Sequence, residues 1–251
     1  MGSKNAINAL HFGLIGEQLE HSFSKSYFDA HFPTQYQVPA TYANFEIPHK
    51  DGLKTFCQTK AMELQGFNVT IPYKETIMSF LDVIDPDAQN IGAVNTVKQT
   101  NGILTGYNTD WIGFKTMLQP YLRAKTHKAL ILGTGGASKA VAYACRQLDI
   151  PYTFISSTDK RYWSYKDVDS LVLSTHNIII NTTPLGMYPN TDACPEIPYG
   201  AINASHTVVD LIYNPSLTLF LSRAADQGAT VINGQKMLEI QAEKAWELWL
   251  S

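Results

Sequence analysis

The stretch of sequence that decides the fold spans residues 129–138 and reads Ala129-Leu130-Ile131-Leu132-Gly133-Thr134-Gly135-Gly136-Ala137-Ser138. Its apolar beginning predicts a short buried strand, and the apolar positions after Ser138 predict a helix. Glycines between a strand and a helix let the backbone approach a pyrophosphate, whose charge is favoured by the amides and dipole of the helix N-terminus. Because Ser138 occupies the third glycine position of G-x-G-x-x-G, a merely tight strand-to-helix turn stays open as the alternative.

The second half of the chain continues the pattern that this stretch begins. Apolar strand candidates recur there at 129–132, 152–155, 177–180 and 207–211. Such a rhythm, with roughly 20 to 30 residues per repeat, is typical of βα units in a parallel sheet. Amphipathic spacing predicts helices at 111–118 and 237–249.

In the first half of the chain, the patterns that predict strands and helices are shorter and more mixed. Strands are predicted at 10–15, 42–47 and 66–71, and a helix at 51–60. A hairpin is predicted over Thr96–Tyr107, because Asn101-Gly102 tolerates positive φ at both turn positions. Residues 17–24 are interpreted as a polar loop, in which an extended backbone would place Ser22 and Ser24 on one side.

Composition excludes several classes of protein. Of the 251 residues, 45% are hydrophobic and 16% charged, below the roughly 25% charged content usual for soluble domains, which favours a compact chain with ample core. A formal charge of -3 without a run of like charges argues against a nucleic-acid partner. No apolar run approaches the ~18 residues of a membrane span, so no membrane partner is expected. The apolar stretch at 6–15 is broken and lacks a small-residue cleavage site, so a secretory signal is not expected either.

The cysteines and histidines carry no metal or disulfide signature. The three cysteines lie far apart and form no Cys-x-x-Cys pair, so they are interpreted as reduced, cytoplasmic thiols. The seven histidines show no metal-ligand spacing, and no metal site is expected.

Several polar segments cannot all be explained by the needs of a hydrophobic core or of turns. In the first half they lie at His21–Ser26, Asn68–Lys74, Gly92–Thr96 and Gly106–Asp110, and in the second half at Asn181–Met187, Asp210–Tyr213 and Gly234–Gln241. In this order they resemble the shikimate dehydrogenase family. The resemblance extends from about Gly13 to Gln241, nearly the whole chain.

The resemblance implies an α/β fold in three parts. Residues 1–109 would form a substrate-binding domain, and residues 110–233 an NADP-binding, Rossmann-like domain with a parallel sheet. Residues 234–251 would form a C-terminal helix that packs back toward the first domain. The implied reaction is the reversible NADPH-dependent reduction of 3-dehydroshikimate to shikimate, in aromatic amino acid biosynthesis, by a monomer or homodimer whose partners are small molecules.

The resemblance also implies roles for individual residues. Reducing a ketone creates an alkoxide that needs a proton, and Lys74 is the expected donor, with Asp110 orienting it and the substrate hydroxyl. The family's substrate carboxylate positions match Ser22 and Ser24, with Tyr213 nearby. Its ring-hydroxyl positions match Thr70, Lys74, Asn95, Asp110 and Gln241.

Each of these residues also has a structural interpretation. Lys74 fits a solvated lysine at the start of a helix running to Leu81, and Asp110 fits a favourable anion in a first helical turn. Ser22 and Ser24 could be cap hydroxyls, Asn95 could cap the hairpin, and Gln241 could be an exposed polar residue.

The residues at the tip of the predicted strand at 152–155 should indicate whether the cofactor is NAD or NADP. No acid stands there, while Lys160 and Arg161 follow within reach, which favours NADP; Asp159 keeps NAD possible. Members of the family that use NADP often have Asn-Arg-Thr where this chain has Ser156-Ser157-Thr158. The candidate cofactor-binding residues are Gly133, Gly135, Gly136, Ala137, Ser156, Ser157, Thr158, Arg161, Thr182, Leu211 and Gly234.

Two alternatives to an NADP-dependent shikimate dehydrogenase stay open. One is a quinate/shikimate dehydrogenase that prefers NAD, because the arginine of the Asn-Arg-Thr segment is missing. The other is a non-catalytic module that binds shikimate or nucleotide, because a fold does not fix a function.

Overall fold

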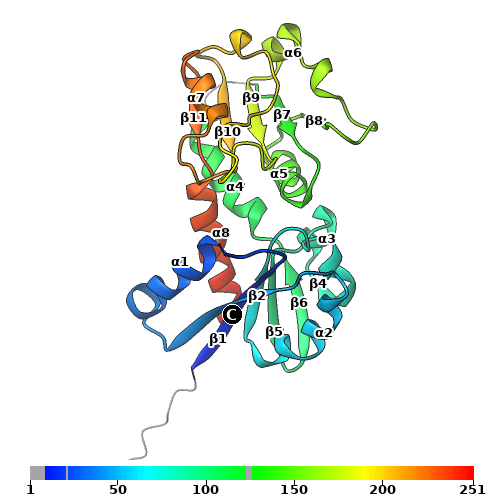
Figure 1. The fold of residues 1–251 in the computed structure, drawn as a ribbon, viewed down its shortest axis with the longest axis vertical. Coiled ribbons are helices and arrows are strands. Elements are labelled where there is room, and N and C mark those ends of the chain that lie inside the picture. The colour runs from blue at the N-terminus through cyan, green and yellow to red at the C-terminus, as the bar shows by residue number, and fades with distance from the viewer. Residues whose placement is uncertain (1–8, 21, 123–125) are drawn as a thin grey trace, which may run out of the picture. The chain divides into compact units, whose positions relative to one another are not determined.

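The computed structural model describes residues 9–20, 22–122 and 126–251 (Figure 1). The chain divides into two compact units, Met1–Thr109 with Ala242–Ser251, and Asp110–Gln241. The second boundary lies inside helix α8 (Gln235–Leu250), later than the boundary at 234 expected from the sequence. The reason is that the beginning of α8 packs in the second unit and its last turns pack in the first. Within the described ranges no helix has the length and apolar character needed to span a membrane.

The first unit is built on a six-stranded mixed sheet in the order β2-β1-β3-β5-β6-β4. Its strands are β1 (Leu10–Gly16), β2 (Ala40–Glu46), β3 (Gly66–Val69), β4 (Val83–Ile84), β5 (Thr96–Thr100) and β6 (Ile103–Tyr107). β1 pairs in parallel with β2 and β3, whereas β5 runs antiparallel to β3 and β6. The predicted hairpin is confirmed, with φ of 52° at Asn101 and 82° at Gly102.

Helices cover both faces of this sheet. They are α1 (Phe23–His31), α2 (Gly52–Gln58) and α3 (Pro86–Ile91), with short π or 3₁₀ turns at Phe32–Tyr36, Lys60–Glu63 and Thr76–Phe80. One face packs on α2 and α3, and the other on α1 and the end of α8. On the face that packs on α1 and α8, the ring of Trp249 stacks on Phe12 at 4.6 Å. Trp249 Nε1 donates to the Val97 carbonyl at 2.9 Å. The expected return of the C-terminal helix is therefore confirmed.

Two expectations for the first unit are wrong. Ser22 and Ser24 do not lie on an extended strand-like segment, because Ser22 is the N-cap of α1 and Ser24 lies in its first turn. This helix forms because Tyr27 and Phe28 are buried in the aromatic core layer. Lys74 does not begin an α-helix running to Leu81; it lies in a turn followed by the 3₁₀ segment Thr76–Phe80.

The second unit is built on a five-stranded parallel sheet in the order β11-β10-β9-β7-β8. Its strands are β7 (Ala129–Leu132), β8 (Tyr152–Ile155), β9 (Ile178–Asn181), β10 (Thr207–Asp210) and β11 (Thr230–Ile232). The four strands predicted from the apolar runs are confirmed. β11 was not predicted, because only Ile232 of its three residues is buried.

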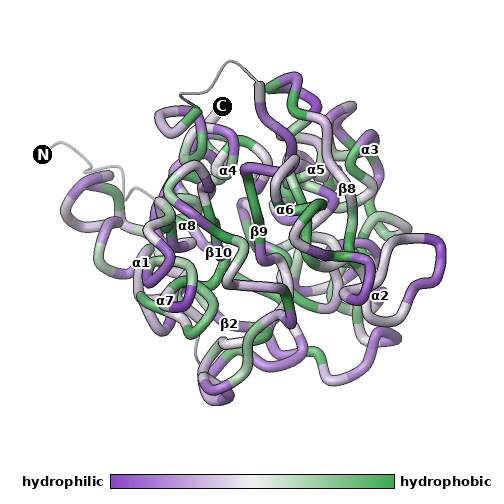
Figure 2. The backbone as a smooth tube through the Cα atoms, turned by 90° about the horizontal axis from the view of Figure 1, so that it is seen from above, coloured by the Kyte–Doolittle hydropathy of each residue, from purple (hydrophilic) through white to green (hydrophobic). Residues whose placement is uncertain are grey.

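Helices cover both faces of this parallel sheet too. They are α4 (Asp110–Leu118), α5 (Gly136–Gln147), α6 (Ser170–Thr175) and α7 (Leu219–Ala225), with 3₁₀ turns at Gln119–Tyr121, Tyr165–Asp167 and Tyr199–Ala201. Alternate residues of β9 face the two layers: Ile180 packs with α4 and α5, and Ile179 packs with α6 and α7. Burial on both sides explains the apolar run Ile178–Ile180 of β9, and Figure 2 shows β9 as hydrophobic.

Candidate active site

The parallel sheet of the second unit has a switch point between β7 and β9. Numbered along the chain, its strand order is 2-1-3-4-5, so the connections after β7 and β9 lead away in opposite directions. Ligands of such sheets bind beyond the carboxyl ends of the strands at this point. Thr182, just after β9, donates from its N–H and its Oγ1 to the Leu132 carbonyl at 2.9 and 2.7 Å. The two loops are therefore held side by side.

The glycine-rich loop fits this place closely. Gly133 has a φ of 114°, and a Cβ there would lie 2.6 Å from Thr182 Oγ1, so a side chain is excluded. Gly135 is the N-cap of α5, and a Cβ there would have nothing within 4 Å. Ser138 is buried and its Oγ donates to the Gly135 carbonyl at 2.6 Å, which accounts for a serine in place of the third glycine. Free amides at the N-terminus of a helix such as α5 can bind a diphosphate.

Leu211 and Gly234 meet at the same edge of the sheet. Leu211 N–H donates to the Asn181 carbonyl at 3.0 Å, which places it directly after β10. A Cβ on Gly234 would lie 2.0 Å from the Leu211 carbonyl oxygen, so only glycine permits this approach. The beginning of α8 is thereby packed on the loop that carries Tyr213, whose side chain is half-buried.

A buried carboxylate connects the loops after β9 and β10. The Asp210 side chain is fully buried and accepts hydrogen bonds from Thr218 Oγ1 at 2.7 Å, the Ile212 amide at 3.0 Å and Asn181 Nδ2 at 3.1 Å. Burial raises the pKa of Asp210 to about 6, although these hydrogen bonds oppose the rise. From the sequence, Asn181 and Asp210 were only parts of motifs; no signal local to either residue shows that they form one network.

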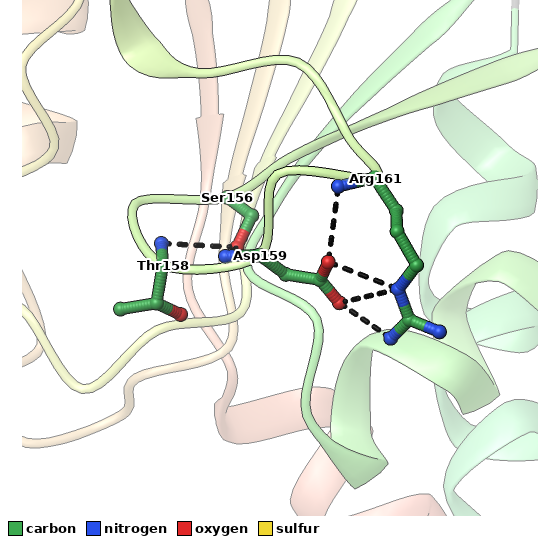
Figure 3. Close-up of polar contacts among 4 residues, drawn as sticks. All are labelled: Ser156, Thr158, Asp159 and Arg161. Carbon is green, nitrogen blue, oxygen red and sulfur yellow. Dashed lines mark hydrogen bonds and ion pairs between the residues drawn. The ribbon is translucent and has the colours of Figure 1, made fainter.

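The loop at the tip of β8 contains an ion pair between Asp159 and Arg161 (Figure 3). Ser156 Oγ accepts from the amides of Thr158 and Asp159 at 3.3 and 3.0 Å. The Asp159 carboxylate accepts in turn from the amide, Nε and Nη2 of Arg161. The hydrogen bonds from Arg161 lower the pKa of Asp159 to about 2. Ser156 is therefore occupied in building the loop, and the guanidinium of Arg161 is already paired.

The polar segments of the first unit meet at one edge of its sheet. β3 runs parallel to β1 and antiparallel to β5, so the residues after β1 and β3 share this edge with those before β5 and after β6. Thr70 N–H donates to the Ile15 carbonyl at 2.9 Å, and the Lys74 carbonyl accepts from Val94 N–H at 2.7 Å. The topology therefore brings Thr70 and Lys74 beside the segment that contains Asn95.

A chain of buried hydrogen bonds runs through this edge. Tyr42 donates to Asn68 Oδ1 at 2.7 Å, and Asn68 Nδ2 donates to Thr96 Oγ1 at 3.1 Å. Asn95 Oδ1 accepts from Thr96 Oγ1 at 3.1 Å and from the Thr109 amide at 2.7 Å. Burial raises the pKa of the Tyr42 phenol, while its hydrogen bond with Ser24 opposes the rise. Two candidate substrate residues, Ser24 and Asn95, thus belong to one network that includes Thr109.

Asp110 and Gln241 lie on facing helices of the second unit. Asp110 is the first residue of α4 and is buried. One turn later, a Cβ on Gly113 would lie 2.7 Å from the Met237 carbonyl and 3.4 Å from Gln241 Cβ, so α4 and α8 touch there. The alternative that Gln241 is an exposed polar residue is wrong, because it is 8% exposed.

The candidate residues are divided between the two units. Ser22, Ser24, Thr70, Lys74 and Asn95 belong to the first, while Asp110, Tyr213, Gln241 and all the candidate cofactor residues belong to the second. Across the described ranges, no group of three or more His, Cys, Asp or Glu side chains could hold a metal ion.

Known proteins resemble this chain over most of its length. Residues 14–97 match the family model described as the shikimate dehydrogenase substrate binding domain. Shikimate dehydrogenase (NADP(+)) of Methanococcus maripaludis strain C6 is 40% identical over 94% of this chain and 90% of its own. A crystal structure of a shikimate dehydrogenase in complex with NADP+ covers 96% of this chain and 90% of its own, with 37% identity and a TM-score of 0.86. Shikimate 5-dehydrogenase of Thermus thermophilus, in complex with NADP(H) and shikimate, covers 96% and 93%, with 31% identity and a TM-score of 0.82.

Proposed function

The chain belongs to the shikimate dehydrogenase family, and we propose which of its residues carry the family's reaction. The protein is an NADP-dependent oxidoreductase that interconverts 3-dehydroshikimate and shikimate. The observation that carries this function is the 40% identity to an NADP-dependent shikimate dehydrogenase over 94% of the chain. The first unit is proposed to bind the substrate and the second the cofactor, which the family match at residues 14–97 and the switch point of the parallel sheet support.

NADP is proposed to bind at the carboxyl edge of the parallel sheet. Gly133, Gly135, Gly136 and Ala137 would hold the diphosphate on the first amides of α5, and the open space at Gly135 supports this role. Thr182, Leu211 and Gly234 would line the nicotinamide end, because they meet at the same edge. When bound, the nicotinamide supplies or accepts the hydride.

Lys74 is proposed to give a proton to the substrate oxygen during ketone reduction. An ammonium near this oxygen stabilises the negative charge that develops in the transition state and then neutralises it by proton transfer. Val94 fixes the Lys74 backbone by its hydrogen bond of 2.7 Å, so the side chain starts from a defined place at the edge of the first sheet. In the oxidation direction the same amine would take the proton from the substrate hydroxyl.

Asp110 is proposed to accept a hydrogen bond from the substrate hydroxyl and to orient the ammonium of Lys74. Its position at the start of α4, directly after the hydrogen-bonded Thr109, supports this role. The N-terminal end of a helix is a favourable place for a negatively charged side chain.

The remaining polar residues are proposed to bind the substrate's fixed groups. Ser22, the N-cap of α1, and Ser24, in its first turn, would donate to the carboxylate at a helix end that itself favours an anion. Thr70, Asn95 and Gln241 would contact ring hydroxyls, and Tyr213 would lie near the carboxylate. Thr158, Ser157 and Arg161 would contact the adenosine phosphate, whereas Ser156 shapes their loop.

A spectrophotometric assay tests the function. Purified protein with shikimate and oxidised cofactor should generate the absorbance of reduced nicotinamide, with a higher kcat/KM for NADP+ than for NAD+. A higher kcat/KM for NAD+ would favour the quinate/shikimate alternative. Absence of turnover with either cofactor would contradict the proposal and leave a binding module.

A further inference from the structure

The loop after β8 holds its side chains in a defined arrangement. Its base is closed by the Ser156 amide, which donates to the Trp163 carbonyl at 2.7 Å. Its turn is fixed by Ser156 Oγ, which accepts from the Asp159 amide at 3.0 Å. Gly133 N–H donates to the Ile155 carbonyl at 2.8 Å, so the loop begins beside the glycine-rich loop. Asp159 is therefore placed by the backbone at the tip of the strand that follows the phosphate-binding helix.

Asp159 and Arg161 are bound to each other in this loop. Arg161 Nε lies 3.0 Å from Oδ1 and 3.1 Å from Oδ2 of Asp159, and Nη2 lies 2.5 Å from Oδ2 (Figure 3). The carboxylate thus occupies one two-donor edge of the guanidinium, the kind of edge that also binds a phosphate. The Arg161 side chain is 81% exposed and the Asp159 side chain 25%. The pair carries no net charge, and the low pKa of Asp159 keeps it ionised at neutral pH.

An acid and an arginine at this place favour different forms of a dinucleotide's ribose. At the tip of the second strand of such a sheet, an acid binds a free ribose 2′-hydroxyl, whereas an arginine accommodates a 2′-phosphate. Here both are present, and each is the other's partner. A 2′-phosphate must either displace the Asp159 carboxylate from this edge of Arg161 or bind the remaining donors while close to the negative charge of the carboxylate; a 2′-hydroxyl meets neither obstacle.

We propose that Asp159 is a specificity-determining residue that limits the preference of this enzyme for 2′-phosphorylated cofactor by holding Arg161 in an ion pair. The inference rests on the proposed use of NADP at the edge of the second sheet. Releasing Arg161 from the carboxylate, so that its guanidinium can bind the phosphate, should strengthen NADP binding roughly three- to tenfold at low salt. The loss of direct repulsion between the carboxylate and the phosphate contributes the smaller part of this gain.

The first test compares Asp159→Asn with the parent protein. The KM for NADP+ in shikimate oxidation should fall about three- to tenfold at low ionic strength, and the KM for NAD+ should stay the same or rise. In ~0.5 M salt the gain should shrink below twofold, because exposed charges are screened. Asp167→Asn is the control: it removes a nearby carboxylate that accepts from Ser164 and does not contact Arg161, so neither KM should change by more than about twofold.

A second comparison asks whether Asp159 acts through Arg161. In an Arg161→Ala background, Asp159→Asn should lower the KM for NADP+ by less than half as much as in the parent, compared on a logarithmic scale. An equal gain in both backgrounds would overturn the proposal, as would a weaker affinity of Asp159→Asn for NADP+, which would show that Asp159 instead positions Arg161 for the phosphate.

Calorimetric titration of NADP+ and NAD+ repeats the comparison without turnover. Shikimate-dependent turnover of the parent protein tests the proposed function, and the ratio of the two cofactor affinities between parent and Asp159→Asn tests the role of Asp159. An unchanged ratio in an active enzyme would refute only the role of Asp159. If the parent binds both cofactors but turns over neither, the proposed function fails while the affinity ratio still decides the inference.

Discussion

The side-chain amide of Asn181 donates a hydrogen bond of 3.1 Å to the buried carboxylate of Asp210, across the ends of two neighbouring strands. Asn181 also accepts from the amide and hydroxyl of Thr183, at 3.0 and 2.6 Å. On the other side, Tyr188 N–H donates to the Asn214 carbonyl at 3.2 Å. The loops that carry Thr182 and Tyr213 are therefore fixed to each other through the Asn181–Asp210 contact.

Replacing Asp210 should separate its hydrogen bonding from its charge. Asp210→Ala leaves three buried donors without their acceptor and should lower the free energy of unfolding by roughly 3 kcal/mol. Asp210→Asn can still accept from Asn181 and Ile212 on its oxygen and donate to Thr218, so it should lose less than half of that amount. Urea unfolding of the three proteins checks the order. Equal losses for both variants would show that the charge, not the hydrogen bonds, matters.

The same carboxylate makes stability depend on pH. Because the folded-state pKa of Asp210 is about 6, above the unfolded value of roughly 3.9, the folded protein favours the protonated form. Its stabilising contribution is complete below about pH 4 and is lost as pH rises through 6, by roughly 3 kcal/mol relative to Asp210→Asn. Thermal or urea unfolding of both proteins between pH 4 and 7.5 measures the difference. A constant difference would refute the raised pKa.

Gly135→Ala should damage cofactor binding without damaging the fold. Its Cβ would have nothing within 4 Å and the residue has a φ of -81°, so the free energy of unfolding should be unchanged. The added methyl would enter the space proposed for the diphosphate and raise the KM for NADP+ and NAD+ alike, by about tenfold or more. Gly200→Ala, which also has open space, is the matched control and should leave both constants unchanged.

Lys74→Ala should lose most of kcat with a smaller change in KM, since a proton donor acts chiefly as charge develops in the transition state. The expected loss is ~10²- to 10⁴-fold. Lys54→Ala, an exposed lysine on α2, serves as the control and should keep the parent kcat. A kcat for Lys74→Ala within threefold of the parent would remove Lys74 from the chemistry.

Ser22→Ala should mainly raise the KM for shikimate, because a carboxylate far from the reacting carbon is held about equally in the ground and transition states. Loss of one charge-assisted hydrogen bond corresponds to roughly 1.5 to 3 kcal/mol. Ser26→Ala, whose hydroxyl donates to the Phe23 carbonyl in the same helix, should leave this KM unchanged. If the cofactor KM rose instead while that for shikimate stayed fixed, the assignment of the first unit to the substrate would be wrong.

The amino-acid sequence by itself determined most of the strands and the turn of one hairpin. Apolar runs such as Ala129–Leu132 are buried on both faces of a sheet, and Asn101-Gly102 suits positive φ, so neighbouring residues alone carry this information. The same local chemistry identified the glycine-rich loop, because Gly133 and Gly135 are needed for backbone conformation and space near a helix end.

Only the tertiary structure decided which side chains pair. Helix α1 was missed because Phe28 is buried against Trp249, which lies at the other end of the chain. Arg161 is paired with Asp159 because the loop closed by Ser156 and Trp163 brings their side chains together. Periodicity and turn preferences act between neighbours in the chain. A buried hydrogen bond or an ion pair depends instead on which atoms the complete fold brings within about 3 Å of each other.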